Sequence, residues 1–405
     1  MSDSGLRPWK GRRVLLGVAG GIASYKSAWL ARLLTKAGAQ VDVVLTRAAT
    51  EFIGVVTFEA LTGRPVHTGL FDHGRALDHI RLAKECDLFV IAPATADLMA
   101  RAATGQADDL LTACLLAAAS PVLMVPAMND RMWAHAQTQA NASHLRSIGY
   151  AVLEPDEGML AAGEGSGPGR MPEPEAIFAH IGRMLTPPSL AGKSVLVTAG
   201  PTREAIDPVR FISNHSSGKM GVAIAESAWR RGAAVTLVAG PVTAPIPIGV
   251  EHVHVESAAE MQAAVSGKIG ASDVVVMSAA PADYRAAQVA TGKIKKTGAA
   301  RSMDLVETDD ILRSTADQRK KGAVVVGFAL ETDDLLANAR RKLESKTLDL
   351  IVLNAANEAG AGFGGDTNRV TFIARDGAPE PLPLMSKRDV ADQLLDRVEA
   401  LIRER

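Results

Sequence analysis

Glycines and small residues follow the first apolar run of the chain. Gly20, Gly21, Ile22, Ala23 and Ser24 join a predicted strand to a predicted helix. Such a junction presents backbone N–H groups at the positive end of a helix dipole, which suits it to binding phosphate. The spacing is not G-x-G-x-x-G, so the standard dinucleotide fingerprint is absent and a simple tight turn is the alternative.

Two further loops follow buried-looking strands. Ala94 and Thr95 come after one apolar run, and Met128 and Asn129 come after the next. Ligands of open α/β sheets collect beyond the carboxyl ends of strands, where small residues and a hydroxyl suit a flat ring and an amide suits a carboxylate. Helix capping by Thr95 and Asn129 is the alternative. Two such loops at successive strand ends favour a ligand site.

His79 is a candidate base, because imidazole exchanges protons near neutral pH. It lies near a predicted helix start, where a single His is also typical of a structural or exposed side chain. The residues alone leave both interpretations open.

The second half carries cations and polar side chains. Asn214 precedes a predicted helix, Lys293 begins a three-lysine segment, and Asp283 follows a predicted strand. Lysines suit phosphate chemistry, although a solvated loop is the alternative. Lys342 and Lys346 share a helix face at i and i+4, or are simply exposed charges.

Short apolar runs that alternate with helical patterns must position these residues. The runs are apolar throughout, as in strands buried on both faces of a parallel sheet. We therefore predict an α/β protein of two doubly wound, Rossmann-like domains with mainly parallel sheets. A Pro-Pro pair separates residues 1–188 from 189–405, and the Gly-rich stretch 155–174 is a candidate flap. The predicted strands are 14–19, 41–46, 88–92, 122–126, 150–153, 194–198, 235–239, 274–277, 324–328, 350–353 and 370–373.

Composition narrows the class of protein. The 405 residues have a formal net charge of −1, which gives no whole-protein argument for nucleic acid or an anionic membrane. Cys86 and Cys114 are too few for a disulfide scaffold and fit a cytoplasmic protein. No apolar run is long enough for a membrane span.

As a set, the first-half motifs resemble the flavin-dependent cysteine decarboxylase family. They are GGIASYK at 20–26, HI at 79–80, APATAD at 92–97, PAMN at 126–129 and GPGRM at 167–171. The resemblance implies a flavodoxin-like domain that binds FMN and acts on phosphopantothenoylcysteine. The flavin would oxidise the substrate thiol, CO₂ would leave beside the resulting C=S, and the reduced flavin would return the electrons.

The same resemblance implies the site residues. His79 would be the base, Asn129 would hold the carboxylate, and Met128 and Arg170 would also contact substrate. The residues implied to contact FMN are Gly20, Gly21, Ile22, Ala23, Ser24, Thr46, Ala94 and Thr95. The family's flap Cys, a proton donor, is absent from residues 160–167, which leaves Glu164, solvent or the reduced flavin as alternatives.

The second-half motifs resemble bacterial phosphopantothenate–cysteine ligase. They are TAGPTRE at 198–204, PVR at 208–210, NHSSGKMG at 214–221, ADYR at 282–285, KIKK at 293–296, GFA at 327–329 and Asn354. Both halves on one chain resemble the bifunctional coenzyme A biosynthesis enzyme. The ligase would use CTP and Mg²⁺ to join 4′-phosphopantothenate to cysteine through an acyl-cytidylate.

By the same analogy Asn214 positions the acyl group, Arg210 contacts substrate and Lys293 is catalytic. The residues implied for the CTP site are Ala279, Asp283, Lys293, Asp310, Ile311, Phe328, Lys342 and Lys346. No magnesium ligand can be assigned. The resemblance also implies a homo-oligomer, a dodecamer of trimeric FMN domains and dimeric ligase domains. The alternatives are a flavin-binding regulatory protein with an inactive decarboxylase half and an NAD(P)-linked Rossmann oxidoreductase.

Overall fold

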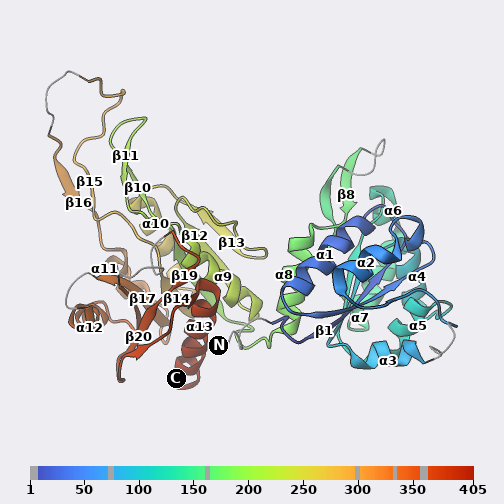
Figure 1. Ribbon diagram of the computed structural model, residues 1–405. Helices are drawn as coiled ribbons and strands as arrows, with labels where there is room; N and C mark the ends of the chain where they lie inside the picture. Colours follow the sequence, from blue (N-terminus) through green and yellow to red (C-terminus); the bar gives the residue numbers. More distant parts are fainter. Residues whose placement is uncertain (1–7, 72–76, 160–164, 297–301, 332–334, 356–363) are drawn as a thin grey trace. The chain divides into compact units, whose positions relative to one another are not determined.

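The computed structural model describes residues 8–71, 77–159, 165–296, 302–331, 335–355 and 364–405 (Figure 1). The chain divides into two compact units, Met1–Pro187 and Pro188–Arg405. The division falls within the Pro-Pro pair, where neither proline can donate a backbone hydrogen bond. Each unit is a sheet covered by helices.

The first unit is built on an all-parallel, six-stranded sheet in the order β3-β2-β1-β4-β5-β6. Strand β3 is a two-residue addition at the edge, and the other five strands have the flavodoxin order 2-1-3-4-5. The direction of winding reverses between β1 and β4. The strands are β1 Arg13–Val18, β2 Gln40–Leu45, β3 Val66–His67, β4 Leu88–Ala94, β5 Val122–Pro126 and β6 Ala151–Val152.

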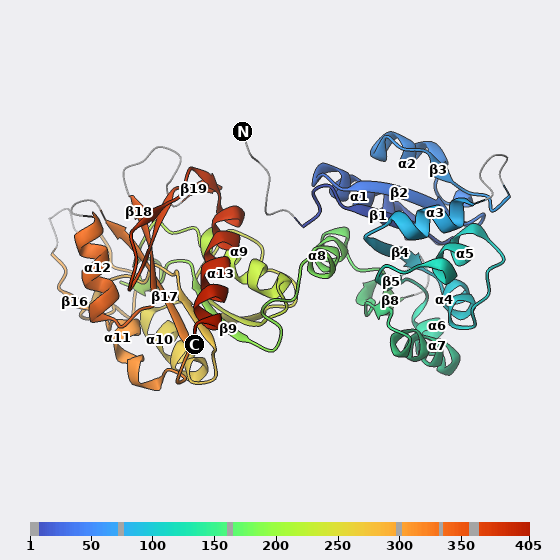
Figure 2. The same cartoon turned by 90° about the horizontal axis from the view of Figure 1, so that it is seen from below.

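Helices cover both faces of this sheet (Figure 2). Leu16 packs with α1, α2 and α8 on one face, whereas Leu15 packs with α3, α4, α5 and α7 on the other. Neighbouring residues of one strand thus enter different cores, so the run must be apolar throughout. The helices are α1 Ser24–Lys36, α2 Val55–Thr62, α3 Asp78–Glu85, α4 Ala96–Ala103, α5 Leu110–Ala117, α6 Asp130–Ala134, α7 Ala136–Ser147 and α8 Pro174–Leu185.

The second unit has an eight-stranded sheet in the order β13-β12-β9-β14-β17-β18-β20-β21. Its first six strands are parallel in the Rossmann order 3-2-1-4-5-6, and β20 and β21 add antiparallel to one edge. The strands are β9 Ser194–Ala199, β12 Ala234–Ala239, β13 Glu251–His254, β14 Val274–Met277, β17 Val324–Glu331, β18 Leu350–Ala355, β20 Val370–Ala374 and β21 Glu380–Pro381. The helices are α9 Lys219–Arg230, α10 Ala258–Ile269, α11 Ile311–Ser314, α12 Leu335–Ser345 and α13 Lys387–Arg403.

Short two-stranded pieces lie outside both main sheets. The pieces are β7 Asp156–Met159 with β8 Ser166–Arg170, β10 Arg203–Ala205 with β11 Phe211–Ser213, β15 Tyr284–Ala286 with β16 Leu305–Glu307, and β19 Thr367–Asn368 with β22 Met385–Ser386. The first three extend from their units in Figure 1. Among the described residues, no helix combines the length and apolar composition needed to cross a membrane.

Candidate active sites

A cavity of about 600 Å³ opens at the carboxyl ends of β1, β2 and β4 in the first unit. This is the point where the winding of the sheet reverses, the usual ligand position of an open α/β fold. Its lining includes the predicted residues Gly20, Thr46 and Thr95. The other lining residues are Ala19, Arg47, Ala48, Glu51, Ala96, Asp97, Arg101, Asp109 and Met132.

Gly20, which lines this cavity, and the next residue Gly21 have different surroundings. A Cβ on Gly20 would lie 2.4 Å from the Cβ of Ala48 and 2.6 Å from its carbonyl carbon, so no larger residue fits. A Cβ on Gly21 would meet only the Thr95 methyl, at 3.9 Å. Ser24 is buried, and its hydroxyl donates to the Gly21 carbonyl at 2.7 Å. Gly20 therefore permits close packing of the loop, and Ser24 fixes its shape.

The charges that line the cavity are unevenly compensated. Arg101 contacts Asp97 at 3.1 Å, Asp108 at 3.0 Å and Asp109 at 2.8 Å. Burial would lower the pKa of Arg101, but these carboxylates raise it above its ordinary value.

Arg47, which sequence reasoning did not select, makes no ion pair among the described residues. Its position directly after Thr46 at the end of β2 was the available signal.

Both proposed capping interactions are present. Thr95 accepts from the N–H of Leu98 at 3.3 Å, and Asn129 accepts from the N–H of Arg131 at 2.9 Å. Thr95 nevertheless also lines the cavity, whereas Asn129 does not. Within the described part of the chain, the amide nitrogen of Asn129 makes no hydrogen bond.

The β7–β8 hairpin occupies the described part of the candidate flap and contacts the loop that carries Met128. The N–H of Met128 donates to the Gly169 carbonyl at 3.0 Å. Gly169 has φ +148°, and a Cβ there would lie 2.3 Å from the Met128 carbonyl oxygen. Arg170 pairs with Glu173, which also contacts the buried Lys26 at 3.1 Å. Glu164 lies outside the described residues.

His79 lies in the first turn of α3. Its Nδ1 is buried and has no hydrogen-bond partner among the described residues. The neighbouring Asp78 contacts His67 Nδ1 at 2.9 Å and Arg81 at 3.0 Å, which anchors the start of the helix. His67 and Asp78 were not selected from the sequence, because their pairing depends on the fold.

In the second unit the corresponding reversal lies between β9 and β14. The side-chain amide of Asn214 donates to the Ala280 carbonyl at 3.2 Å and the Pro281 carbonyl at 2.9 Å. The N–H of Ala279 donates to Thr198 Oγ1 at 3.1 Å. Asn214 therefore lies against the loop that follows β14, and Ala279 of the same loop contacts the end of β9.

The other residues predicted for this site differ in their surroundings. Lys346 pairs with Asp310 at 2.8 Å, which helps to hold the pKa of Asp310 below its usual range although burial opposes the shift. Ile311 is only 4% exposed and packs in the core. Its side chain therefore serves packing in this structure. Phe328 and Lys342 are half-buried, and Asp283 is exposed.

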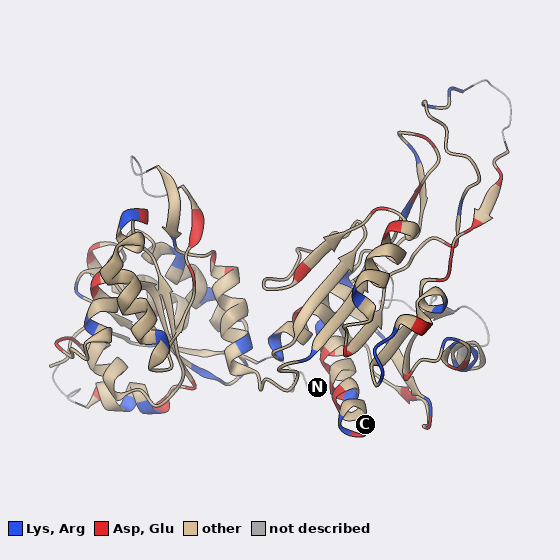
Figure 3. Ribbon diagram, turned by 180° about the vertical axis from the view of Figure 1, so that it is seen from behind, with Lys and Arg blue, Asp and Glu red and all other residues tan. Residues whose placement is uncertain are grey.

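Arg210 is already engaged in this structure. Its guanidinium contacts Asp207 and donates to the Ile294 carbonyl at 2.9 Å, next to the exposed Lys293. Sequence reasoning missed Asp207. Basic and acidic residues, coloured blue and red on the ribbon, are interspersed along the chain of both units (Figure 3).

Comparisons with known proteins agree with this division of the chain. The flavoprotein family model matches residues 4–186, and the model of the DNA/pantothenate metabolism flavoprotein C-terminal domain matches residues 190–402. The chain is 48% identical over 409 residues to the coenzyme A biosynthesis bifunctional protein CoaBC of Mycolicibacterium smegmatis. This match covers 97% of the present chain and 98% of the relative. The CoaBC proteins of Vibrio vulnificus and Bacillus subtilis are 45% and 46% identical, over the same shares of both chains.

The doubly wound units, their sites and the domain matches define a two-domain α/β flavoprotein enzyme. The chain belongs to the family of coenzyme A biosynthesis bifunctional proteins, with a decarboxylase domain followed by a ligase domain. The family that the motifs indicated is confirmed, and so is the predicted α/β fold class. The alternative of an ordinary NAD(P)-linked oxidoreductase is wrong.

The two glycines of the first site give a test of this geometry. We expect Gly20→Ala to lower the free energy of unfolding by about 1–3 kcal/mol, because its methyl group would overlap Ala48. Gly21→Ala is the matched control, and its free energy of unfolding should change by less than about 0.5 kcal/mol. Urea denaturation of both variants measures the difference. Equal stabilities would contradict the close packing of Gly20.

Proposed function

We propose that this enzyme ligates 4′-phosphopantothenate with cysteine at the expense of CTP and then decarboxylates phosphopantothenoylcysteine to 4′-phosphopantetheine with FMN. The observation that carries the proposal is the placement of matched residues at both reversal points. Gly20, Thr46 and Thr95 line the cavity of the first unit, and Asn214 contacts the loop that follows β14 in the second. Family membership supports both activities.

The cavity of the first unit fits FMN in size and chemistry. Its volume of about 600 Å³ lies within the usual range for cofactor sites. Residues 20–24 and Thr46 would hold the flavin with Ala94 and Thr95, and Arg47 would provide a cation for the phosphate. Bound FMN would supply two-electron redox chemistry to the substrate thiol.

The remaining roles in decarboxylation fall to residues that do not line this cavity and that the family resemblance implies. His79 is the proposed base, because its buried Nδ1 has no partner among the described residues to compete for a proton. Asn129 and Met128 would hold the substrate, and the amide N–H₂ of Asn129, which has no partner among the described residues, suits its carboxylate. Arg170 would approach from the hairpin that contacts Met128. Glu164 stays a candidate proton donor.

Replacement of His79 tests the first activity. We expect His79→Asn to retain the fold and the flavin but to lose decarboxylation by about 10²–10⁴-fold, because Asn cannot accept the proton. The measurement is CO₂ release from phosphopantothenoylcysteine. The variant's ligase activity is the internal control. Wild-type CO₂ release by the variant would remove His79 from the mechanism, and none from the wild type would indicate an inactive, regulatory first half.

For the ligase we propose that the substrate carboxylate attacks the α-phosphorus of CTP and expels pyrophosphate. The cysteine amine then attacks the acyl carbon and displaces CMP. Asn214 would position the acyl group and Lys293 would stabilise negative charge as it develops. The CTP site would contain Ala279, Asp283, Asp310, Ile311 through its backbone, Phe328, Lys342 and Lys346.

Magnesium would enter with the nucleotide. Among the described residues no group of three or more His, Cys, Asp or Glu is arranged to hold a metal ion. Mg²⁺ keeps several waters and binds mainly through substrate phosphates with one or two carboxylates, so a preformed cluster is not required.

Lys293 provides the test of the second activity. We expect Lys293→Gln to impair ligation by at least about tenfold, because a neutral amide cannot replace the cation, and to spare decarboxylation. Lys295→Gln removes the same charge from the same loop and should lose less activity. Product analysis with 4′-phosphopantothenate, CTP and cysteine measures both variants. Equal effects would indicate that the lysines only form a solvated loop.

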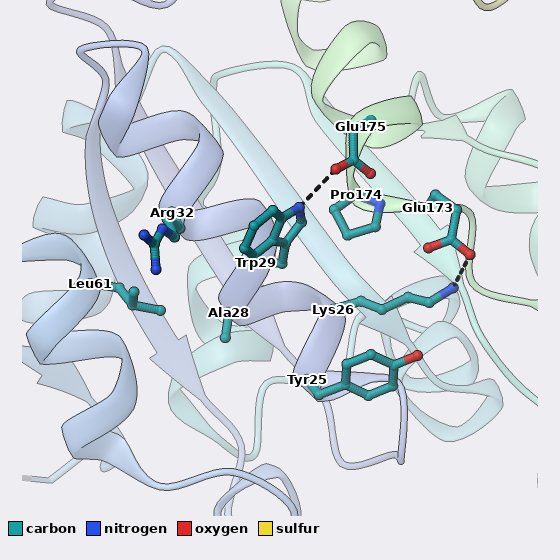
Figure 4. A pocket seen from close by; sticks show the side chains of 9 residues that line it. All are labelled: Tyr25, Lys26, Ala28, Trp29, Arg32, Leu61, Glu173, Pro174 and Glu175. Carbon is teal, nitrogen blue, oxygen red and sulfur yellow. Dashed lines mark hydrogen bonds and ion pairs between the residues drawn. The ribbon is translucent and has the colours of Figure 1, made fainter. Parts of the chain in front are cut away.

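We propose that the protein is a dodecamer, in which the FMN domains form trimers and the ligase domains form dimers. Exposed apolar side chains on both units support self-association. Ile22 is 67% exposed, and Tyr25 and Trp29, which are 63% and 47% exposed, line a cavity of about 510 Å³ between α1 and the start of α8 (Figure 4). Phe211 and Tyr284, on hairpins of the second unit, are 49% and 48% exposed. Light scattering would measure the assembled mass.

A further inference from the structure

A buried carboxylate lies in the turn that joins β10 to β11. The side chain of Asp207 is fully buried. One carboxylate oxygen accepts from the N–H groups of Val209 and Arg210, both at 2.9 Å. The other accepts from Arg210 Nε at 3.0 Å and from the N–H of Ile294 at 3.1 Å. Asp207 thus joins its own turn to a segment 87 residues further along the chain.

The same pair of side chains contacts both backbone groups of Ile294. Its N–H donates to Asp207, and its carbonyl accepts from Arg210 Nη2 at 2.9 Å. A second link lies just before, where the N–H of Ala290 donates to the Ile206 carbonyl at 3.0 Å. The turn therefore holds the backbone at Ala290 and at Ile294, on either side of Lys293.

The backbone of the lysine segment does not pair with any strand that the structure describes. Residues 293–296 belong to neither helix nor strand, and Lys293 is exposed. Because no sheet ladder fixes this backbone, its position depends on the contacts that the β10–β11 turn supplies. The Arg210 guanidinium and the buried hydrogen bonds lower the pKa of Asp207 well below its usual range, so the carboxylate is ionised at neutral pH. Charged acceptors make the stronger hydrogen bonds.

We infer that Asp207 and Arg210 are positioning residues of the ligase, which hold the Ile294 backbone so that Lys293 reaches the reacting carboxylate and phosphate. This inference rests on the proposed role of Lys293. It gives Arg210 a role besides the substrate contact that the family resemblance implies. The same turn also connects Lys293 with Asn214, because β11 leads from the turn directly to Asn214.

The test is a double-mutant cycle between Asp207→Asn and Lys293→Gln in the full-length enzyme. Asparagine keeps the shape of Asp207 but loses the charge and one acceptor. We expect Asp207→Asn to lower kcat for ligation at least about tenfold, with a smaller change in KM for CTP. In the Lys293→Gln background the same substitution should cost less than about twofold, because the lysine it positions is already gone.

Two further variants separate positioning from general stability. Glu204→Gln is the matched control, because Glu204 is also a buried acid of this hairpin but binds the N–H of Ala258 at 2.8 Å. Its effect on ligation should be additive with Lys293→Gln. Arg210→Lys keeps the cation on a half-exposed side chain, loses the two-point contact and should reproduce the coupling to Lys293 even if Asp207→Asn folds poorly.

Limited digestion with trypsin gives a readout that does not depend on activity. In folded Asp207→Asn, cleavage after Lys293 should be several-fold faster than in wild type, whereas in Glu204→Gln it should be unchanged. Additive losses in both cycles, or unchanged cleavage after Lys293, would overturn the positioning role. Wild-type ligation by Lys293→Gln alone would instead refute the proposed function of Lys293, so the two failures are distinguishable.

Discussion

A parallel strand that is buried on both faces can satisfy its backbone only within its own sheet, and this requirement decides where the loops of both units lie. The six parallel strands of each sheet point the same way, so their carboxyl ends share one edge. Loops distant in sequence meet there: Gly20 and Thr95 line one cavity, and Pro201 forms a bridge with Ala280. Both sites occur where the strand order reverses, between β1 and β4 and between β9 and β14.

The two sites are nevertheless held by different forces. In the first unit, backbone segments touch at distances that only glycine allows, with Gly20 against Ala48 and Gly169 against Met128. Shape fixes that site, and the charges nearby are largely neutralised around Arg101. In the second unit, residues 293–296 beyond the sheet belong to neither helix nor strand. Buried hydrogen bonds to an ionised carboxylate hold them instead, because such bonds are strong enough to order irregular backbone.

The sequence was sufficient wherever a run of residues carried its own signal. The predicted strands at 122–126 and 274–277 coincide with β5 and β14, because both runs are wholly apolar and buried. Helix α10 was missed, although Ser257 and Glu260 form a capping box that could have marked its start. The pairing of β15 with β16 could not be predicted, since its partners are separated by residues 287–304 and all of their residues except Ala286 are exposed.

The same distinction explains which site residues could be found. Gly20, Thr95 and Asn214 follow or flank strand ends, so their types and positions were informative. Asp207 was not, because a carboxylate three residues before an arginine reads as an exposed ion pair worth a few tenths of a kcal/mol. The fold buries that carboxylate and adds an N–H from residue 294, which no local pattern encodes. Once buried, the charge depends on the contacts that hold the lysine segment. The stability of the β10–β11 turn and the position of Lys293 thus become a single constraint, although the residues involved lie far apart in the sequence.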